Sequence, residues 1–226
     1  TLLAPPLCVC GLVVAPWVVR NHLVLGELVV NTTHGGYTLL LGNNASFYAD
    51  VVRQPWGTVW EGPQQEAWVA ELERDMQQAG ITGEVARDRW MSARAWETMR
   101  SDPAGAARAA MLRVIRFWHV IPSGPAAAGW PIIIVGAVGM FYVLEWFAVL
   151  SGMWTIMRRR EGFWLPVLLM VVAFTAVHLL YWSNVRMRAP LVPALALLAV
   201  RGAMIFKRSP GSPPESATSP DNRGLV

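Results

Sequence analysis

Four long apolar runs constrain this chain more than any other feature of its sequence. They cover residues 2–19, 130–157, 162–182 and 190–206. A helix needs about 20 mostly apolar residues to cross the hydrocarbon core of a bilayer, and a longer run is accommodated by tilting. Only 15% of the residues are charged, against about 25% in ordinary soluble domains. The sequence therefore predicts a mainly α-helical integral membrane protein with four transmembrane helices.

Basic residues in the short connections predict the orientation of these helices. Three consecutive arginines at 158–160 join the second and third runs, and the basic pair 207–208 follows the fourth. Such residues favour the cytoplasmic side, and long loops are exempt from this rule. We therefore place residues 20–129 outside, as a mixed, mostly helical extracytoplasmic subdomain. Residues 207–226 are rich in Pro, Ser and Gly and are expected to form a disordered cytoplasmic tail.

The outer loop is expected to contain both strands and helices. Residues 22–41 are rich in Val, Leu, Thr and Tyr with glycine breaks, which predicts one or two short strands. Residues 64–79 and 84–100 predict helices. The side chains expected to anchor these two helices in a core are Trp68, Leu72, Met76, Trp90 and Trp96.

A third helix of the loop has a clear start. Asp102 is a good N-cap and Pro103 suits the first helical position. Beyond them, arginines 108, 113 and 116 lie largely off an apolar face. We expect this helix to lie in the lipid headgroup layer; the alternative is that its apolar face packs on the core of the loop itself. The expected apolar face consists of Ala107, Ala110, Met111, Val114, Ile115 and Trp118.

Several polar residues carry weaker expectations. Cys8 and Cys10 lie two apart in a predicted helix and point in different directions, so a disulfide between them is not expected, and the sequence has no metal-binding motif. Glu145 and His178 lie inside predicted spans, where ionisable groups are functional candidates or structural hydrogen-bonding partners. The net charge of +4 is not gathered in a stripe with aromatic residues, so nucleic acid is not an expected partner.

Two segments resemble a known family. A span ends in Pro16-Trp17-x-x-Arg20-Asn21, and a glycine-rich segment follows with Thr33, Gly35-Gly36-Tyr37, Leu39 and Gly42-Asn43-Asn44; the turn after the third span reads Arg186-Met187-Arg188-Ala189-Pro190. In this order the motifs resemble bacterial GT-C membrane glycosyltransferases of the dolichyl-phosphate-mannose–protein mannosyltransferase-like and RgtA/B/C/D-like group. That family often has Tyr where this chain has Met187.

The resemblance implies an enzyme of the bacterial inner membrane that transfers a sugar from a polyprenyl-phosphate carrier to a lipid, glycan or protein acceptor at the outer face. The family's catalytic acidic residue lies in an upstream loop that this chain does not contain. Because the chain also begins within an apolar run, we expect it to be the C-terminal portion of a longer protein, inactive by itself. No cofactor is expected in this chain, whereas a divalent metal is compatible with the full-length protein.

Specific residues suit this chemistry. Arg20, Arg186 and Arg188 lie at the predicted outer ends of spans, where a guanidinium matches the oxygens of a lipid phosphate; the alternative is that they only anchor helix ends at the interface. The two arginines of the short outer turn also oppose the charge rule, which favours a function for them.

The amides and one carboxylate of the loop complete the candidate set. Asn21, Asn43 and Asn44 are predicted to contact sugar or acceptor hydroxyls, with ordinary turn chemistry as the alternative. Asp50 follows this segment closely and is a candidate to orient an acceptor; the sequence does not identify the general base, because it does not establish the reach of Asp50 to an attacking hydroxyl.

Two other classes of function compete with a transferase. A transporter or flippase fragment is one, but no internal repeat of the spans is visible to support it. The other is a non-enzymatic membrane protein whose outer domain binds a partner.

Overall fold

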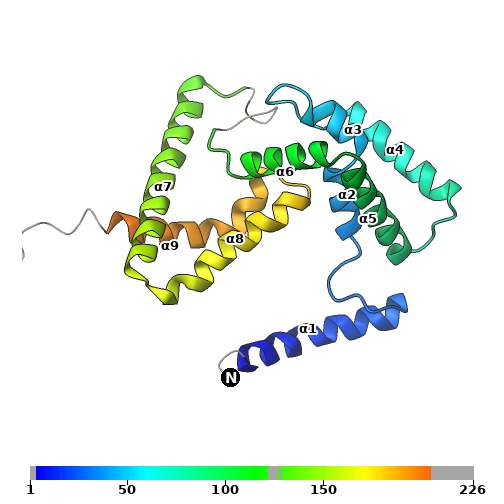
Figure 1. The fold of residues 1–226 in the computed structure, drawn as a ribbon, viewed down its shortest axis with the longest axis horizontal. Helices are drawn as coiled ribbons and strands as arrows, with labels where there is room; N and C mark the ends of the chain where they lie inside the picture. The colour runs from blue at the N-terminus through cyan, green and yellow to red at the C-terminus, as the bar shows by residue number, and fades with distance from the viewer. Residues whose placement is uncertain (1–3, 122–126, 128, 205–226) are drawn as a thin grey trace, which may run out of the picture.

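The computed structural model of the chain describes residues 4–121, 127 and 129–204, and every regular element in these ranges is helical. Helix α1 (Ala4–Leu25) extends away from the other helices (Figure 1). Residues 26–121, which lie between α1 and α7, are called the inter-span segment below. Its elements are α2 (Gly35–Gly42), α3 (Ala45–Phe47), the π-helix η1 (Tyr48–Val52), α4 (Pro63–Gln78), α5 (Glu84–Ser101) and α6 (Pro103–Phe117). The remaining elements are α7 (Ile132–Arg159), η3 (Gly162–Trp164), α8 (Leu165–Leu180), η4 (Val185–Leu191) and α9 (Val192–Ala203).

Among the described residues, three helices are long and apolar enough to cross a membrane. They are Cys8–Leu25 within α1, Ile132–Arg159, and Gly162–Leu180, which joins η3 to α8. Most of their apolar side chains are exposed in the chain's own fold; Leu12 is 73% and Ile132 is 85% exposed. Exposed apolar surface of this extent needs lipid or further helices to cover it. Three of the four predicted runs therefore form helices that could span a membrane.

The fourth predicted span, residues 190–206, is not confirmed. Residues 205 and 206 lie outside the described ranges, as does the predicted tail 207–226. Within them, η4 takes up residues 185–191 and α9 has 12 residues. A helix of that length is about 18 Å long, whereas the hydrocarbon core is about 30 Å thick. Pro190 and Pro193 explain the late start of α9, because proline lacks the N–H that a helix interior requires.

Helices α7 and α9 cross at unusually close range through two glycines. A Cβ atom on Gly152 would lie 2.1 Å from the carbonyl oxygen of Leu198, and one on Gly202 would lie 2.0 Å from that of Ala148. Small residues at such crossings let two backbones touch, which is the usual way in which helices associate in lipid. The side chains around this crossing, among them Val149, form the smaller of the two buried apolar clusters.

The larger apolar cluster holds the inter-span segment together. The predicted helices at 64–79 and 84–100 are confirmed as α4 and α5, and Trp68, Leu72 and Met76 are buried as expected. Trp90 is only half-buried, and Trp96 is exposed. The prediction for Trp96 is wrong because α5 turns that side chain away from α2 and α6, the elements on which it packs.

The strands predicted in residues 22–41 are wrong. Residues 22–25 complete α1, and α2 occupies Gly35–Gly42. The backbone N–H of Gly36 donates to Asp88 Oδ1 at 2.6 Å, and a Cβ on Gly36 would lie 2.0 Å from the Asp88 carbonyl oxygen. A short apolar run such as Leu39–Leu41 does not distinguish a buried helix from a buried strand. Here the close packing of α2 on α5 decides in favour of the helix.

Helix α6 begins as predicted but packs on a different face. Asp102 Oδ1 accepts a hydrogen bond from the N–H of Gly105 at 2.8 Å, which confirms the N-cap. The buried positions are Gly105, Ala109, Arg113 and Phe117. Met111 and Ile115, expected on the packed or membrane-facing stripe, are exposed. That stripe therefore does not pack on the core of the segment, and its placement in the headgroup layer stays a prediction.

Candidate functional site

A buried arginine joins the inter-span segment to the C-terminal end of α8. Arg113 is only 2% exposed. It donates from Nε and Nη2 to the carbonyl oxygen of Leu179 (3.2 and 2.6 Å), and from Nη1 to that of Gly42. Burial lowers the pKa of Arg113 to about 10, so the guanidinium is still charged at neutral pH. A cation at a helix C-terminus opposes the negative end of the helix dipole and occupies carbonyls that have no partner within the helix.

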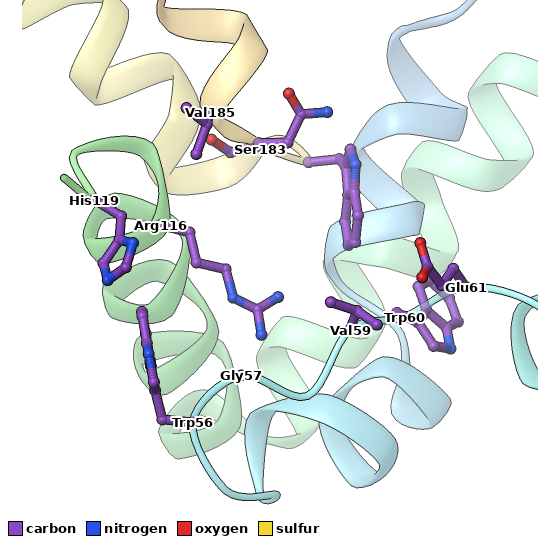
Figure 2. A pocket seen from close by; sticks show the side chains of 11 residues that line it. Trp56, Gly57, Val59, Trp60, Glu61, Arg116, His119, Ser183 and Val185 are labelled. Atoms are coloured by element: carbon purple, nitrogen blue, oxygen red, sulfur yellow. The ribbon is translucent and has the colours of Figure 1, made fainter. Parts of the chain in front are cut away.

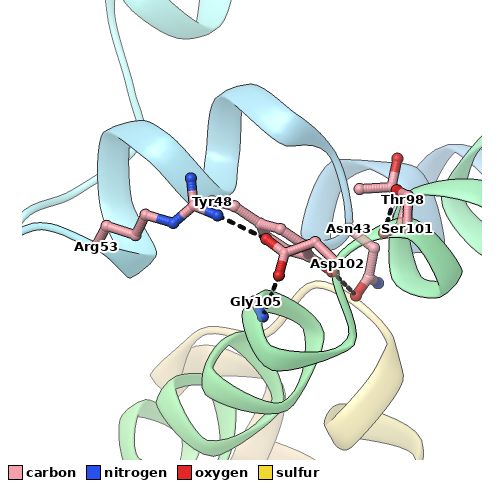
Figure 3. A network of polar contacts seen from close by, with 7 residues as sticks. All are labelled: Asn43, Tyr48, Arg53, Thr98, Ser101, Asp102 and Gly105. Atoms are coloured by element: carbon pink, nitrogen blue, oxygen red, sulfur yellow. Dashed lines mark hydrogen bonds and ion pairs between the residues drawn. The ribbon is translucent and has the colours of Figure 1, made fainter.

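The Gly-Asn-Asn motif completes this junction. Asn43 Nδ2 donates to the carbonyl oxygens of Leu39 (2.8 Å) and Leu180 (2.7 Å), and its Oδ1 accepts from the Tyr48 hydroxyl (3.2 Å) and from Arg113 (3.3 Å). Figure 3 shows the contact between Asn43 and Tyr48 beside the Asp102 cap of α6. A Cβ on Gly42 would lie 3.1 Å from Arg113 Nη1, so the glycine leaves room for the arginine. The motif thus fixes where α8 ends relative to α2 and α6.

Next to this junction lies a pocket of about 270 Å³. Its walls come from the segment before α4, the C-terminal end of α6 and the turn after α8, as Figure 2 shows. The Arg116 side chain extends from α6 into the space between these walls. The lining residues are Trp56, Gly57, Val59, Trp60, Glu61, Arg116, His119, Trp182, Ser183, Asn184 and Val185.

The charged residues that line the pocket are one arginine, Arg116, and one glutamate, Glu61. Arg116 lies one turn of α6 after Arg113, and the carbonyl oxygen of Thr58 is its only hydrogen-bond acceptor among the described residues. A guanidinium has five N–H donors, so most of its donors remain free for a ligand. Burial lowers the pKa of Arg116, but arginine is protonated throughout the physiological range. Glu61 is the one carboxylate that lines the pocket, and in the described part of the chain it forms no ion pair with Arg116.

Three buried polar atoms of the lining have no hydrogen-bond partner among the described residues. They are Trp60 Nε1, His119 Nδ1 and Ser183 Oγ. More than about 90% of buried polar groups in native proteins are paired, and each unpaired one costs about 1–3 kcal/mol. All three atoms are buried from solvent and therefore lie behind the surface of the pocket rather than facing a ligand in it.

Arg188, predicted to bind phosphate, lies behind the wall of this pocket. Its side chain is buried, and Nη1 lies 3.3 Å from the carbonyl oxygen of His119 and 3.4 Å from that of Phe117. The guanidinium also stacks over the ring of Tyr142 in α7, 4.9 Å from its centroid. Arg188 therefore holds the His119 backbone in place and joins α6 to α7.

Arg186 lies next to a lining residue in the chain, and Asp50 lies outside the pocket. Arg186 is exposed and follows the lining residue Val185, and its backbone N–H donates to Asn184 Oδ1 at 2.9 Å. Asp50 lies on η1 and does not line the pocket. Arg186 is thus the chain neighbour of a lining residue but does not itself line the pocket, and neither does Asp50.

Arg20 and Asn21 belong to a different hollow at the end of α1. Asn21 Oδ1 accepts from Arg20 Nη1 (3.1 Å), and Asn21 Nδ2 donates to the carbonyl oxygen of Val29 (3.0 Å). Trp17 Nε1 donates to the carbonyl oxygen of Asn31 (2.9 Å), and the Arg20 guanidinium lies over the Trp17 ring. This motif fastens residues 26–31 back onto α1, and Arg20 does not share a pocket with Arg186 or Arg188.

The amides of Asn43 and Asn44 are also engaged with the protein. Asn44 Oδ1 accepts from the N–H of Phe47 (2.7 Å), and its Nδ2 donates to the carbonyl oxygen of Leu40 (2.9 Å). Both side chains are buried, so a sugar contact would require them to leave these partners. In α8, His178 stacks on Phe117 with centroids 4.5 Å apart, and no ion pair joins it to Glu145 among the described residues.

Sequence reasoning missed the residues that form this pocket. The sequence indicates Arg116 as part of a basic face and of a helix that runs into Arg116-Phe117-Trp118 before a span, but it does not single out His119, Trp56, Trp60 or Trp182. The available signal was the density of aromatic residues on both sides of Arg116 and at the end of the third apolar run. It was not sufficient because these segments lie far apart in the chain and meet only through the Arg113 junction.

No protein family, curated protein or solved structure matches the chain. The fold and the pocket define the class: a helical protein with three membrane-spanning candidates in its described residues and a tryptophan-lined pocket at the end of one of them. In the described ranges, no three His, Cys, Asp or Glu side chains gather as a metal site.

Proposed function

We propose that the chain is the C-terminal part of a membrane glycosyltransferase that transfers a sugar from a polyprenyl-phosphate carrier to a lipid, glycan or protein acceptor at the outer membrane face. The observation that carries this proposal is the pocket at the C-terminal end of α8, with Arg116 extending into it and tryptophans in its walls. In the predicted topology this end of α8 lies at the outer headgroup level, where the phosphate of such a carrier lies.

The chemistry of the pocket suits the reaction. The acceptor oxygen forms a bond to the anomeric carbon of the sugar while the bond from that carbon to the carrier's phosphate oxygen breaks. The proton of the acceptor goes to a base in the upstream part of the protein, and the carrier leaves as a lipid phosphate with additional negative charge. A fixed cation beside that leaving group stabilises the charge as it develops, by about 3–4 kcal/mol for a well-placed donor. Tryptophan faces bind the apolar faces of sugar rings, and Asn184 and Glu61 offer groups for hydroxyls.

Transfer in membranes tests the proposal. Membranes that carry the full-length protein receive a radiolabelled polyprenyl-phosphate sugar, and labelled acceptor is counted. Arg116→Gln is expected to lower transfer by about 100- to 1,000-fold, since that is the usual effect of removing one donor that stabilises transition-state charge. The matched control is Arg108→Gln, an exposed arginine two turns earlier on α6, which is expected to leave transfer unchanged. Equal transfer by both variants removes the pocket from the reaction, and no transfer by the wild type with any carrier sugar favours a transporter or a non-enzymatic protein.

A further inference from the structure

A cluster of three arginines lies in the turn that joins α7 to α8 (Figure 1). Arg158 and Arg159 end α7, Arg160 follows them, and all three residues are exposed. In the described part of the chain none of the three forms an ion pair. Both helices that meet at this turn are membrane-spanning candidates, so the turn would lie at the surface of the bilayer that they cross.

The carboxylate that follows the cluster in the chain does not neutralise it. Glu161 comes directly after Arg160, but both of its oxygens accept hydrogen bonds from Arg201 of α9, and the Nε to Oε2 distance is 3.0 Å. The Glu161 and Arg201 side chains are only 19% and 17% exposed, so this pair is largely withdrawn from the surface. The charges of the three arginines therefore remain uncompensated.

Arg160 occupies a backbone position that normally selects glycine. Its φ of 53° and ψ of 41° lie in the left-handed region, and among the described residues no other non-glycine residue has a positive φ. The N–H of Glu161 then donates to the carbonyl oxygen of Ile156 at 3.1 Å, which is the closure that a glycine usually provides at the end of a helix. A long cationic residue at such a position indicates a function for its side chain.

The face of α7 that leads to Arg158 is apolar and exposed. Leu150 and Trp154 precede Arg158 at intervals of four residues, which places all three on one face of the helix. Trp154 is 64% exposed, whereas α9 packs on the other side of α7 at Gly152. Beyond the turn, Phe163 adds a second ring and is 75% exposed. Aromatic rings at the ends of spans lie at the headgroup level of a bilayer, with acyl chains on one side and phosphates on the other.

We propose that this turn binds an anionic phospholipid, with the lipid phosphate against arginines 158–160 and the acyl chains along the Leu150–Trp154 face of α7. Guanidinium groups match phosphate oxygens, and a basic cluster next to a span attracts lipids with net negative charge. A zwitterionic headgroup brings its own cation, for which the turn offers no unpaired carboxylate. The site lies at the end of α8 opposite to the pocket, and it does not depend on the proposed function.

The lipid source is favoured over a soluble phosphate by the exposed rings. A soluble phosphate would contact the arginines and leave Trp154 and Phe163 uncovered, whereas a phospholipid covers both the charges and the apolar face. The same two rings make the proposal measurable, because the acyl chains of a bound lipid would lie beside Trp154.

Quenching of Trp154 by brominated lipids tests the site. The protein is placed in phosphatidylcholine bilayers that contain brominated phosphatidylglycerol or brominated phosphatidylcholine, and the fluorescence difference between each variant and its Trp154→Phe counterpart isolates this ring. One arginine beside an anionic headgroup is worth about fivefold in affinity. With one or two arginines engaged by a headgroup, we expect phosphatidylglycerol to be preferred by about 5- to 25-fold. An excess of glycerol 3-phosphate is expected to leave this preference unchanged.

Removal of the charges is expected to abolish the preference. In the triple variant Arg158→Gln/Arg159→Gln/Arg160→Gln, phosphatidylglycerol should be preferred by less than about twofold, because only the apolar contacts remain. Quenching by brominated phosphatidylcholine is expected to be unchanged, which would show that α7 is still in the bilayer.

A matched triple variant controls for net charge. Arg74→Gln/Arg100→Gln/Arg108→Gln removes three exposed arginines of the inter-span segment that form no ion pair among the described residues. The change in charge is the same, but these residues lie outside the turn, so the preference for phosphatidylglycerol at Trp154 is expected to stay within about twofold of the wild type.

A single variant without a folding penalty completes the test. Arg160→Gly removes one charge where glycine adopts the backbone conformation freely, so it is expected to keep or raise the melting temperature and to lower the preference about two- to fivefold. The proposal is overturned if the wild type takes up both lipids equally, if glycerol 3-phosphate displaces the lipid, or if the control triple variant loses as much preference as the triple variant of the turn. It is also overturned if the turn variants keep the preference of the wild type.

Discussion

Replacing Asn43 with alanine tests whether the Gly-Asn-Asn motif holds the end of α8 in place. The side chain makes four hydrogen bonds, two to backbone carbonyls and two from Tyr48 and Arg113. Its loss leaves the buried Tyr48 hydroxyl and the Leu180 carbonyl without these partners. Each stranded group costs about 1–3 kcal/mol, so we expect the free energy of unfolding to fall by about 3–4 kcal/mol.

The melting temperature in detergent gives the readout. For a chain of this size, 1 kcal/mol corresponds to about 2–4 °C, so Asn43→Ala is expected to melt roughly 6–16 °C below the wild type. Asn31→Ala is the matched control, because in the described residues only the backbone carbonyl of Asn31 takes part in a hydrogen bond.

A double-mutant cycle shows whether the loss comes from this contact. In a Tyr48→Phe background no hydroxyl is stranded, so Asn43→Ala is expected to cost about 1–2 kcal/mol less than in the wild type. Equal melting temperatures for Asn43→Ala and Asn31→Ala would refute the reasoning, since they would mean that the motif does not support the junction.

Three further substitutions test the packing. Gly152→Ala is expected to lower the melting temperature, because the added methyl group overpacks the crossing at a cost toward the upper end of about 1–3 kcal/mol. The control is Gly136→Ala on the same helix α7. A Cβ there meets no atom within 4 Å, so this variant is expected to be neutral or slightly stabilising. Gly36→Ala is likewise expected to separate α2 from α5, which circular dichroism and thermal melting would report as lost cooperativity, whereas Gly35→Ala, with 4.0 Å to its nearest neighbour, is expected to be tolerated. Asp102→Ala removes the N-cap of α6 and its pair with Arg53, and a loss of about 1–2 kcal/mol in thermal unfolding is expected; no loss would mean that the cap is dispensable.

Local signals in the sequence predicted the helices well. The dipeptide Asp102-Pro103 marks the start of α6 because a carboxylate cap and a proline act within one turn of chain. Three of the four apolar runs form spanning candidates for the same reason, since length and hydropathy are local properties. The prediction of a fourth span failed because Pro190 and Pro193 shorten the helix, and hydropathy alone does not detect this shortening.

Long-range contacts decided the features that the sequence did not predict. The sequence of Leu39–Leu41 is compatible with a strand or a helix, and the packing of α5 against Gly36 selects the helix. Arg113 appears in the sequence as one more residue of a basic face, yet it is buried because the carbonyl oxygens of Gly42 and Leu179 surround it. Arg116 enters a pocket for the same reason, since the aromatic walls come from segments well before and well after it in the chain.

Labelling at Val185, which lines the pocket, tests the central claim most directly. In a variant with Cys8 and Cys10 replaced by serine, Val185→Cys is treated with a membrane-impermeant maleimide in intact cells, and in purified membranes with and without farnesyl phosphate. A lipid-phosphate pocket at the outer face predicts labelling in intact cells and protection by farnesyl phosphate. Labelling only after the cells are permeabilised, or labelling that farnesyl phosphate does not slow, would contradict it.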